Sequence, residues 1–127
     1  MNVVDSSGWI EYVVDGPNAD VFAGPIEQAD ELLVPTISIL EVFKWVLRER
    51  GEADALQGAA LMQQGEVVTL DTATATRATQ LGLMHKLPLA DSVMLATAET
   101  FGATLWTQDV DFDGLPGVRY RAKIYTR

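Results

Sequence analysis

The sequence predicts an α/β fold in which a central, mainly parallel sheet lies between two layers of helices, a three-layer α/β/α sandwich. The first observation is that short β-prone apolar runs alternate with helix-like segments along the chain, as in right-handed strand–helix–strand units. The second is size, because 127 residues with 48% apolar side chains suit a single hydrophobic core. We therefore expect one domain over residues 1–127.

Glycine and proline divide the first half of the chain into expected strands and helices. A β-branched run opens the sequence, Gly16 and Pro17 separate the two helices that follow, and Gly51 ends a longer helix. Trp45, Leu56 and Leu61 are expected to pack the helical hairpin around Gly51. The expected elements are a strand at 2–4, helices at 9–14 and 19–28, a strand at 32–34, and helices at 37–50 and 53–63.

The second half of the chain continues the same alternation. Asp71 is best explained as the cap of a helix, Pro88 lies near the start of the next helix, and Gly102 ends that helix. Apolar and basic residues then alternate near the C-terminus, which is typical of an edge strand with one exposed face. The expected elements are a strand at 66–70, a helix at 73–83, a helix between 88 and 102, a strand at 103–107, and an edge strand at 118–124.

Composition excludes several classes of site. There is no cysteine, so disulfides, thiolate metal sites and cysteine nucleophiles are excluded, and His85 is the only histidine. The formal charge of −9 argues against a broad phosphate-neutralising surface, but it is compatible with carboxylates that gather around a divalent ion. No apolar run approaches the ~20 residues that span a bilayer, so we expect a cytoplasmic protein without a membrane partner.

Four carboxylates are expected to meet at the carboxyl edge of the sheet. Asp5 and Asp109 follow strands directly, and Glu41 and Asp91 lie in the first turns of helices that return to the same edge. Oxygen ligands without histidine or cysteine select a hard cation, Mg²⁺ or Mn²⁺. Such an ion polarises a phosphoryl oxygen and lowers the pKa of a bound water. The four acids therefore predict a metal-dependent nuclease.

Individual acids also have simpler structural explanations. Ser6 or Ser7 is the expected cap of the first helix, and Asp5 is an alternative cap. Ser38 and Glu41 have the spacing of a capping box, in which the glutamate only returns a hydrogen bond to the helix start. Independent caps would not be expected to bring all four acids to one edge.

A calcium loop is the competing interpretation of the last acidic segment. Asp109, Asp111, Asp113 and Gly114 begin such a loop with the correct spacing. The twelfth position, which supplies a bidentate carboxylate in these loops, is Tyr120. The calcium interpretation is therefore disfavoured.

Four short segments occur in order along the chain: Val3-Val4-Asp5-Ser6-Ser7, Ile39-Leu40-Glu41-Val42, Leu87-Pro88-Leu89-Ala90-Asp91 and Leu105-Trp106-Thr107-Gln108-Asp109-Val110-Asp111-Phe112. Together they resemble the successive motifs of the PIN-domain ribonucleases, and most closely those of the VapC-like toxins of bacterial toxin–antitoxin pairs. The residues that match the family's acidic metal site are Asp5, Glu41, Asp91 and Asp109, with Ser6, Thr107 and Asp111 as polar support. The resemblance implies endonucleolytic cleavage of RNA with Mg²⁺ or Mn²⁺, a homodimer, and inhibition by a small cognate antitoxin.

Two other functions remain open from the sequence. One is a PIN-like domain that acts mainly by binding protein, and the other is a metal-dependent DNA nuclease or phosphatase. The pI of about 4.3 is low for a protein that binds RNA, so the binding of RNA would depend on local basic groups in addition to the metal. The candidates for that role are Lys44, Lys86, Arg119, Arg121, Lys123 and Arg127.

Overall fold

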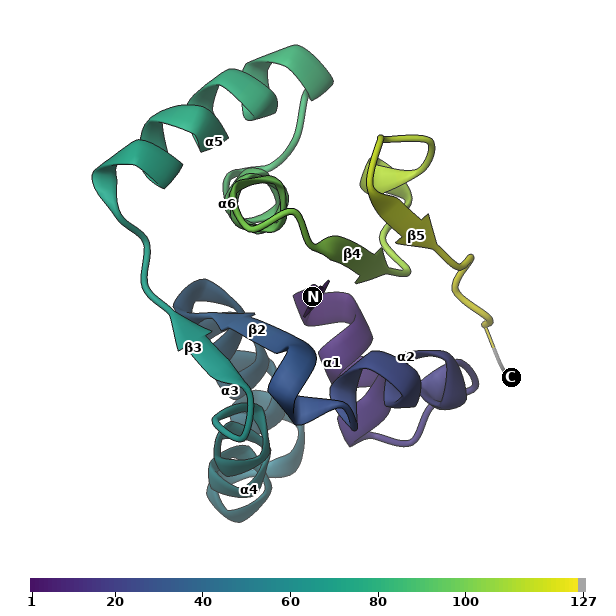
Figure 1. The fold of residues 1–127 in the computed structure, drawn as a ribbon. Helices are drawn as coiled ribbons and strands as arrows, with labels where there is room; N and C mark the ends of the chain where they lie inside the picture. The colour runs from purple at the N-terminus through teal and green to yellow at the C-terminus, as the bar shows by residue number, and fades with distance from the viewer. Residues whose placement is uncertain (126–127) are drawn as a thin grey trace.

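The computed structural model describes residues 1–125, and a five-stranded sheet lies at its centre (Figure 1). The strand order is β3-β2-β1-β4-β5, and the pairing between neighbours is parallel throughout. The strands are β1 (Asn2–Val4), β2 (Leu32–Pro35), β3 (Glu66–Val68), β4 (Thr104–Thr107) and β5 (Val118–Tyr120). The predicted parallel sheet is confirmed, and its central strand is the first in the sequence. Arg127 lies outside the described residues.

Helices cover both faces of this sheet, with α5 and α6 on one side and α1 to α4 on the other (Figure 1). Their bounds are α1 (Ser6–Val13), α2 (Ala19–Ile26), α3 (Thr36–Arg50), α4 (Glu52–Met62), α5 (Thr72–His85) and α6 (Leu89–Thr100). Two 3-10 turns, η1 (Ala29–Glu31) and η2 (Val110–Phe112), complete the described chain. Across residues 1–125, none of these helices combines the length and the apolar content that crossing a bilayer requires.

Alternate side chains of the central strands enter two separate cores. Val3 of β1 and Leu105 of β4 pack in one core with Met94 of α6. Val4 belongs to the other core, where it joins Trp9 of α1. All five side chains are buried. Since successive residues of a strand point to opposite faces, the two cores confirm the predicted three-layer α/β/α sandwich.

The structure corrects two predictions about packing and strand length. Leu56 was expected to pack the α3–α4 hairpin, but it is 55% exposed, and Ala55 is the buried residue of that turn. The edge strand ends at Tyr120 rather than at residue 124. Its ladder ends because the chain turns toward α2, where the side chain of Asn18 donates a hydrogen bond to the carbonyl of Ala122 at 3.0 Å.

The structure also corrects two predicted helix starts. The cap of α1 is Asp5, whose carboxylate accepts a hydrogen bond from the Gly8 backbone N–H at 3.1 Å, so the alternative cap is confirmed and neither Ser6 nor Ser7 is the cap. The capping box in α3 is wrong because the helix begins at Thr36. The Ser38 hydroxyl instead donates to the carbonyl of Pro35 at 2.6 Å. The predicted cap at Asp71 is confirmed, since its carboxylate accepts from the Thr74 N–H at 2.8 Å.

The strand order reverses between β1 and β4, which makes the carboxyl end of these two strands a topological switch point. From β1 the chain first adds β2 and β3 on one side, and it later adds β4 and β5 on the other. The segments after β1 and β4 therefore lead to opposite faces of the sheet, with Trp9 of α1 in one core and Phe112 after β4 in the other. Open α/β sheets bind their ligands at such a switch point.

Gly8 allows α1 to lie close to the sheet and to α2. A Cβ atom at this position would lie 2.7 Å from Val4 Cγ1 and 2.6 Å from Phe22 Cδ1. We expect Gly8→Ala to lower the free energy of unfolding by about 1–3 kcal/mol, because both neighbours are buried and overpacking costs energy of this size. Urea unfolding measures the change.

The matched control is Gly58→Ala in α4, where an added Cβ meets no atom within 4 Å. That variant should be as stable as the unaltered chain or more stable by up to about 1 kcal/mol, since alanine favours the helix. Equal losses in the two variants would contradict close packing at Gly8.

Candidate metal centre

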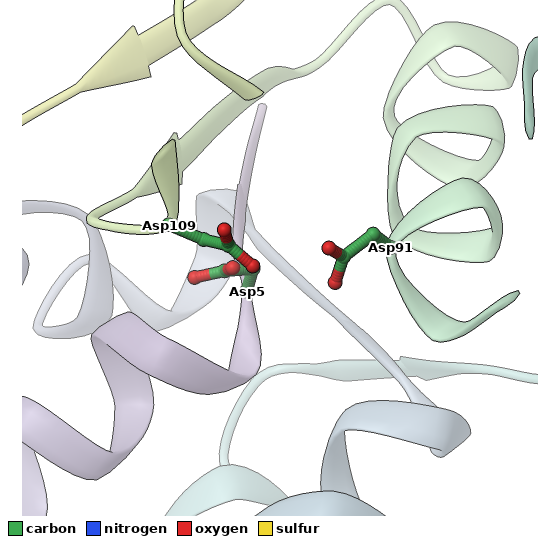
Figure 2. A group of neighbouring side chains, drawn as sticks. All are labelled: Asp5, Asp91 and Asp109. Carbon is green, nitrogen blue, oxygen red and sulfur yellow. The ribbon is translucent and has the colours of Figure 1, made fainter. Parts of the chain in front are cut away.

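Three carboxylates meet at the switch point between β1 and β4. Asp5 follows β1, Asp109 follows β4, and Asp91 lies in the first turn of α6. One carboxylate oxygen from each residue lies within 4.8 Å of those from the other two. Figure 2 shows Asp5 and Asp109 side by side, with Asp91 facing them from its helix. The structure thus brings together three of the four acids that the sequence predicted at this edge.

Asp5 is held by hydrogen bonds to both of its carboxylate oxygens. Oδ1 accepts from the Ser7 hydroxyl at 2.7 Å and from the Gly8 N–H at 3.1 Å. Oδ2 accepts from the Thr107 hydroxyl at 2.9 Å. Burial raises the pKa of Asp5 to about 6 even though these hydrogen bonds favour the charged form, and the charge of Asp109 raises it further. Asp5 is therefore fixed in position, at the cost of a buried charge.

Thr107 connects Asp5 to Asp109. Its hydroxyl donates to Asp5 and accepts the backbone N–H of Asp109 at 2.9 Å. Asp109 in turn caps the η2 turn by accepting the N–H of Asp111 at 3.0 Å. The contact of Asp111 is therefore made by its backbone, while its side chain is exposed. Neither Asp111 nor Asp113 belongs to the three-carboxylate group in the part of the chain described, which disfavours the calcium loop further.

Asp91 reaches the group from a helix face that is otherwise apolar. It is half-buried, and the next residues of α6 from Ser92 to Ala98 are buried. Burial raises the pKa of Asp91, and the neighbouring charges of Asp109, Asp5 and Glu41 raise it further. The three carboxylates thus resist simultaneous ionisation when no cation is present.

Glu41, the fourth predicted acid, lies beside this group. It is not one of the carboxylates within 4.8 Å of one another among residues 1–125. Its Oε1 accepts a hydrogen bond from the Ser6 hydroxyl at 2.6 Å. Glu41 lies in the second turn of α3 rather than in the predicted first turn, because α3 begins at Thr36, five residues before Glu41. Ser6, predicted as polar support, therefore contacts Glu41 and not Asp5.

The donor set fits a hard divalent cation. Within residues 1–125 the ion pairs are Arg48 with Glu49 and Arg77 with Glu99, so no basic side chain neutralises the three aspartates. Carboxylates in such surroundings are costly unless a cation balances them. Oxygen-only ligands are those that Mg²⁺ and Mn²⁺ prefer. Asp5, Asp91 and Asp109 are the residues that would hold the ion.

Ser7 is a site residue that the sequence did not assign to the metal centre. Its hydroxyl donates to Asp5 and also accepts the backbone N–H of Gln108 at 3.3 Å. It thereby ties the end of β1 to the segment after β4. The available signal was its position two residues after an aspartate, a spacing at which side chains and local backbone often form hydrogen bonds.

Thr107→Val tests whether the hydroxyl orients the metal ligands. We expect Mn²⁺ to bind about 10- to 100-fold more weakly, as is typical when a group that orients a ligand is lost. The free energy of unfolding should fall by about 1–3 kcal/mol, because the buried carboxylate of Asp5 loses a donor and the part-buried N–H of Asp109 loses its acceptor. Calorimetric titration and urea unfolding give the two values.

Thr104→Val on the same strand is the control, since no side-chain hydrogen bond of Thr104 supports the carboxylates. It should leave the affinity for Mn²⁺ within about threefold of that of the unaltered protein, a change of less than about 1 kcal/mol. If both variants bind the ion as tightly as the unaltered protein does, Thr107 has no orienting role.

Comparison with known proteins identifies the family. The family model described as the PIN domain matches residues 3–118. A toxin–antitoxin complex from Klebsiella pneumoniae is similar in structure, with 21% sequence identity, a TM-score of 0.80, and coverage of 98% of this chain and 100% of that chain. The VapC20 toxin of Mycobacterium tuberculosis, described as cleaving the sarcin–ricin loop, has 15% identity, a TM-score of 0.77, and coverage of 91% and 95%.

A third similar structure is VapBC2 from Rickettsia felis, bound to a DNA fragment from its promoter, with 13% identity and a TM-score of 0.74. The match covers 95% of this chain and 97% of that one. No curated protein matches the chain in sequence. The family match spans both ends of the sheet and all three clustered aspartates, and this chain therefore belongs to the PIN domain family.

Proposed function

We propose that this chain is a Mg²⁺- or Mn²⁺-dependent endoribonuclease and the toxin of a toxin–antitoxin pair. The observation that carries the proposal is the convergence of Asp5, Asp91 and Asp109 at the sheet's switch point without a basic partner among residues 1–125. Membership of the PIN family supports nuclease activity. The similar toxin–antitoxin structures support an RNA substrate and an antitoxin partner.

The chain's own residues would position the reactants. Asp5, Asp91 and Asp109 would hold the cation, while Thr107 and Ser7 fix the orientation of Asp5. When bound, a divalent ion polarises the scissile phosphoryl group and makes water a stronger nucleophile at neutral pH. The ion also offsets the negative charge that would otherwise repel RNA.

Glu41 is the fourth acid of the proposed site and acts from beside the other three. The Ser6 hydroxyl holds one of its oxygens at 2.6 Å, and its charge already acts on Asp91. We include Glu41 as a catalytic residue, with Ser6 as its support. Asp111 supports the site through its backbone N–H. The proposal further includes a single domain over residues 1–127, a homodimer, and action in the cytoplasm, where RNA is available.

The test is hydrolysis by metal-depleted, antitoxin-free protein to which Mn²⁺ is returned. The substrates are structured RNAs, single-stranded DNA and a small phosphoester, and Asp5→Asn is the control for contamination. The proposal expects RNA cleavage that requires Mn²⁺ and is lost in Asp5→Asn. Preference for DNA or the phosphoester would contradict the substrate class, and lack of hydrolysis would favour a protein-binding domain. A short antitoxin-like reading frame next to the gene is expected for the toxin assignment.

A further inference from the structure

A pocket of about 620 Å³ opens directly beside the three carboxylates. Asp109 is part of its lining, and so is Ser7, which bonds Asp5. Its volume falls in the range of about 300–1,000 Å³ that is usual for sites that bind small organic groups. A larger cavity of about 800 Å³ is lined by residues of α1 to α4, and none of the three aspartates borders it. The smaller pocket is therefore the one that continues from the metal centre.

Aromatic side chains from separate parts of the chain line this pocket. Trp45 comes from α3, Tyr120 from β5, and Tyr125 from the segment that follows β5. Tyr125 is 83% exposed as a residue, so its ring is accessible to a planar ligand. Exposed aromatic rings next to a nucleic-acid site serve as platforms on which bases stack.

The segment after β5 is held against the pocket by polar contacts. The Asn18 side chain donates to the carbonyl of Ala122 at 3.0 Å and to Oε1 of Gln108 at 3.1 Å. The Lys123 ammonium lies 5.4 Å from the centre of the Tyr125 ring. The two hydrogen bonds of Asn18 fix the chain at Ala122, and the next residues of the segment, Lys123 and Tyr125, belong to the pocket lining.

The charge of the lining favours an uncharged ring over a phosphate inside the pocket. Asp109 and Glu11 are the acidic residues of its lining, and Lys123 is the basic one. With an ion bound, the charge of Asp109 would be offset, but Glu11 would still repel a phosphate inside the pocket. A nucleobase carries no net charge, and its N–H groups can approach carboxylates favourably.

We propose that this pocket binds the base of a nucleotide next to the cleaved phosphodiester, with the base stacked on Tyr125. Lys123 contacts the RNA backbone at the rim. The inference rests on the proposed ribonuclease function and deepens it, because it assigns part of the RNA recognition to the C-terminal segment. The rest of that recognition is left to the metal centre.

The experiment measures kcat and KM for an RNA that the unaltered protein cleaves with Mn²⁺. The variants are Tyr125→Ala, Tyr125→Phe, and Phe101→Ala, a control that removes an aromatic ring 46% exposed and outside the pocket. We expect Tyr125→Ala to raise KM about 10- to 100-fold, which corresponds to the loss of one stacked base. The Tyr125→Phe and Phe101→Ala variants should behave like the unaltered protein.

A second arm uses RNAs in which single bases near the cut are removed one at a time. One abasic position should raise KM for the unaltered protein but add nothing in Tyr125→Ala, because the two changes remove the same contact. An unchanged KM in Tyr125→Ala would overturn the pocket assignment. The same holds if every abasic RNA raises KM in Tyr125→Ala as much as it does in the unaltered protein. A Tyr125→Ala variant that loses only its inhibition by antitoxin would also overturn the assignment, and it would indicate that a protein segment occupies the pocket.

The two proposals fail in different ways. If the unaltered protein cleaves no RNA with Mn²⁺, the ribonuclease proposal fails and the pocket assignment fails with it. If RNA is cleaved, and Asp5→Asn abolishes that cleavage while Tyr125→Ala leaves KM unchanged, only the pocket assignment is overturned.

Discussion

Asp91→Asn is expected to lower kcat/KM for Mn²⁺-dependent RNA cleavage by about 100- to 1,000-fold. Loss of a group that merely orients a metal ligand costs about 10- to 100-fold, and Asp91 is itself one of the three residues that would hold the ion. Asparagine keeps the shape of the side chain but supplies a neutral and weaker ligand. The measurement is the cleavage rate at several Mn²⁺ concentrations, which separates weaker binding of the ion from slower chemistry.

The matched control for this variant is Asp113→Asn. It makes the same change in charge on an exposed residue that lies four positions after Asp109 and is no member of the three-carboxylate group. Its rate should stay within about threefold of that of the unaltered protein, since exposed charges contribute little. Equal losses in the two variants would mean that net charge, and not the metal centre, governs cleavage.

Asp5→Asn is expected to make the metal-free protein more stable at pH 8 and to remove its stabilisation by Mn²⁺. Burial raises the pKa of Asp5 from 3.8 to about 6 in the folded chain. The folded state therefore favours the neutral acid, and this contribution to stability is complete below about pH 4 and is lost as the pH rises through 6. A shift of this size corresponds to about 3 kcal/mol, and we expect asparagine to recover about 1–3 kcal/mol of it.

Urea unfolding in EDTA at pH 4.5, 6 and 8 tests this expectation. The difference in unfolding free energy between Asp5→Asn and the unaltered chain should grow in favour of the variant as the pH rises. Added Mn²⁺ should stabilise the unaltered chain, because it binds only the folded site, and should stabilise the variant much less. A stability difference that does not change with pH would contradict a raised pKa of the buried Asp5 carboxyl in the folded chain.

The sequence alone was sufficient to predict the sheet and the side of it on which the acids gather. Parallel strands and returning helices bring strand ends and helix starts to one edge whatever the strand order. That rule places Asp5, Asp91 and Asp109 together, and the structure confirms their proximity. Composition also led to the prediction of a hard cation, since there is no cysteine and only one histidine in the chain, and the identity of the ion stays a prediction.

Details that depend on exact backbone position could not be predicted in this way. The helix α3 begins at Thr36 because the chain enters it directly from Pro35. Glu41 therefore lies in the second turn, where its carboxylate accepts a hydrogen bond from Ser6. Local spacing left Asp5, Ser6 and Ser7 open as the cap of α1, and the strand pairing that holds Asp5 at the sheet edge favours Asp5. The strand order, which places the switch point between β1 and β4, follows from long-range packing that no local pattern predicts.

The pocket beside the metal centre was also beyond local patterns. Its lining joins Trp45 of α3 to Tyr120 and Tyr125, which are about 75 to 80 positions away in the sequence. The alternation of apolar and basic residues near the C-terminus predicted a longer edge strand, whereas the chain leaves the sheet after Tyr120. The contact between Asn18 and Ala122 that redirects it is visible only in three dimensions.

The most direct measurement is the location of Mn²⁺ in crystals of the protein by anomalous scattering. We predict a peak between the three aspartates, with one oxygen from each of Asp5, Asp91 and Asp109 bound to the ion directly or bridged to it by water. A crystal in which Mn²⁺ is absent from this position, or contacts only one of the three carboxylates, would contradict a shared metal site.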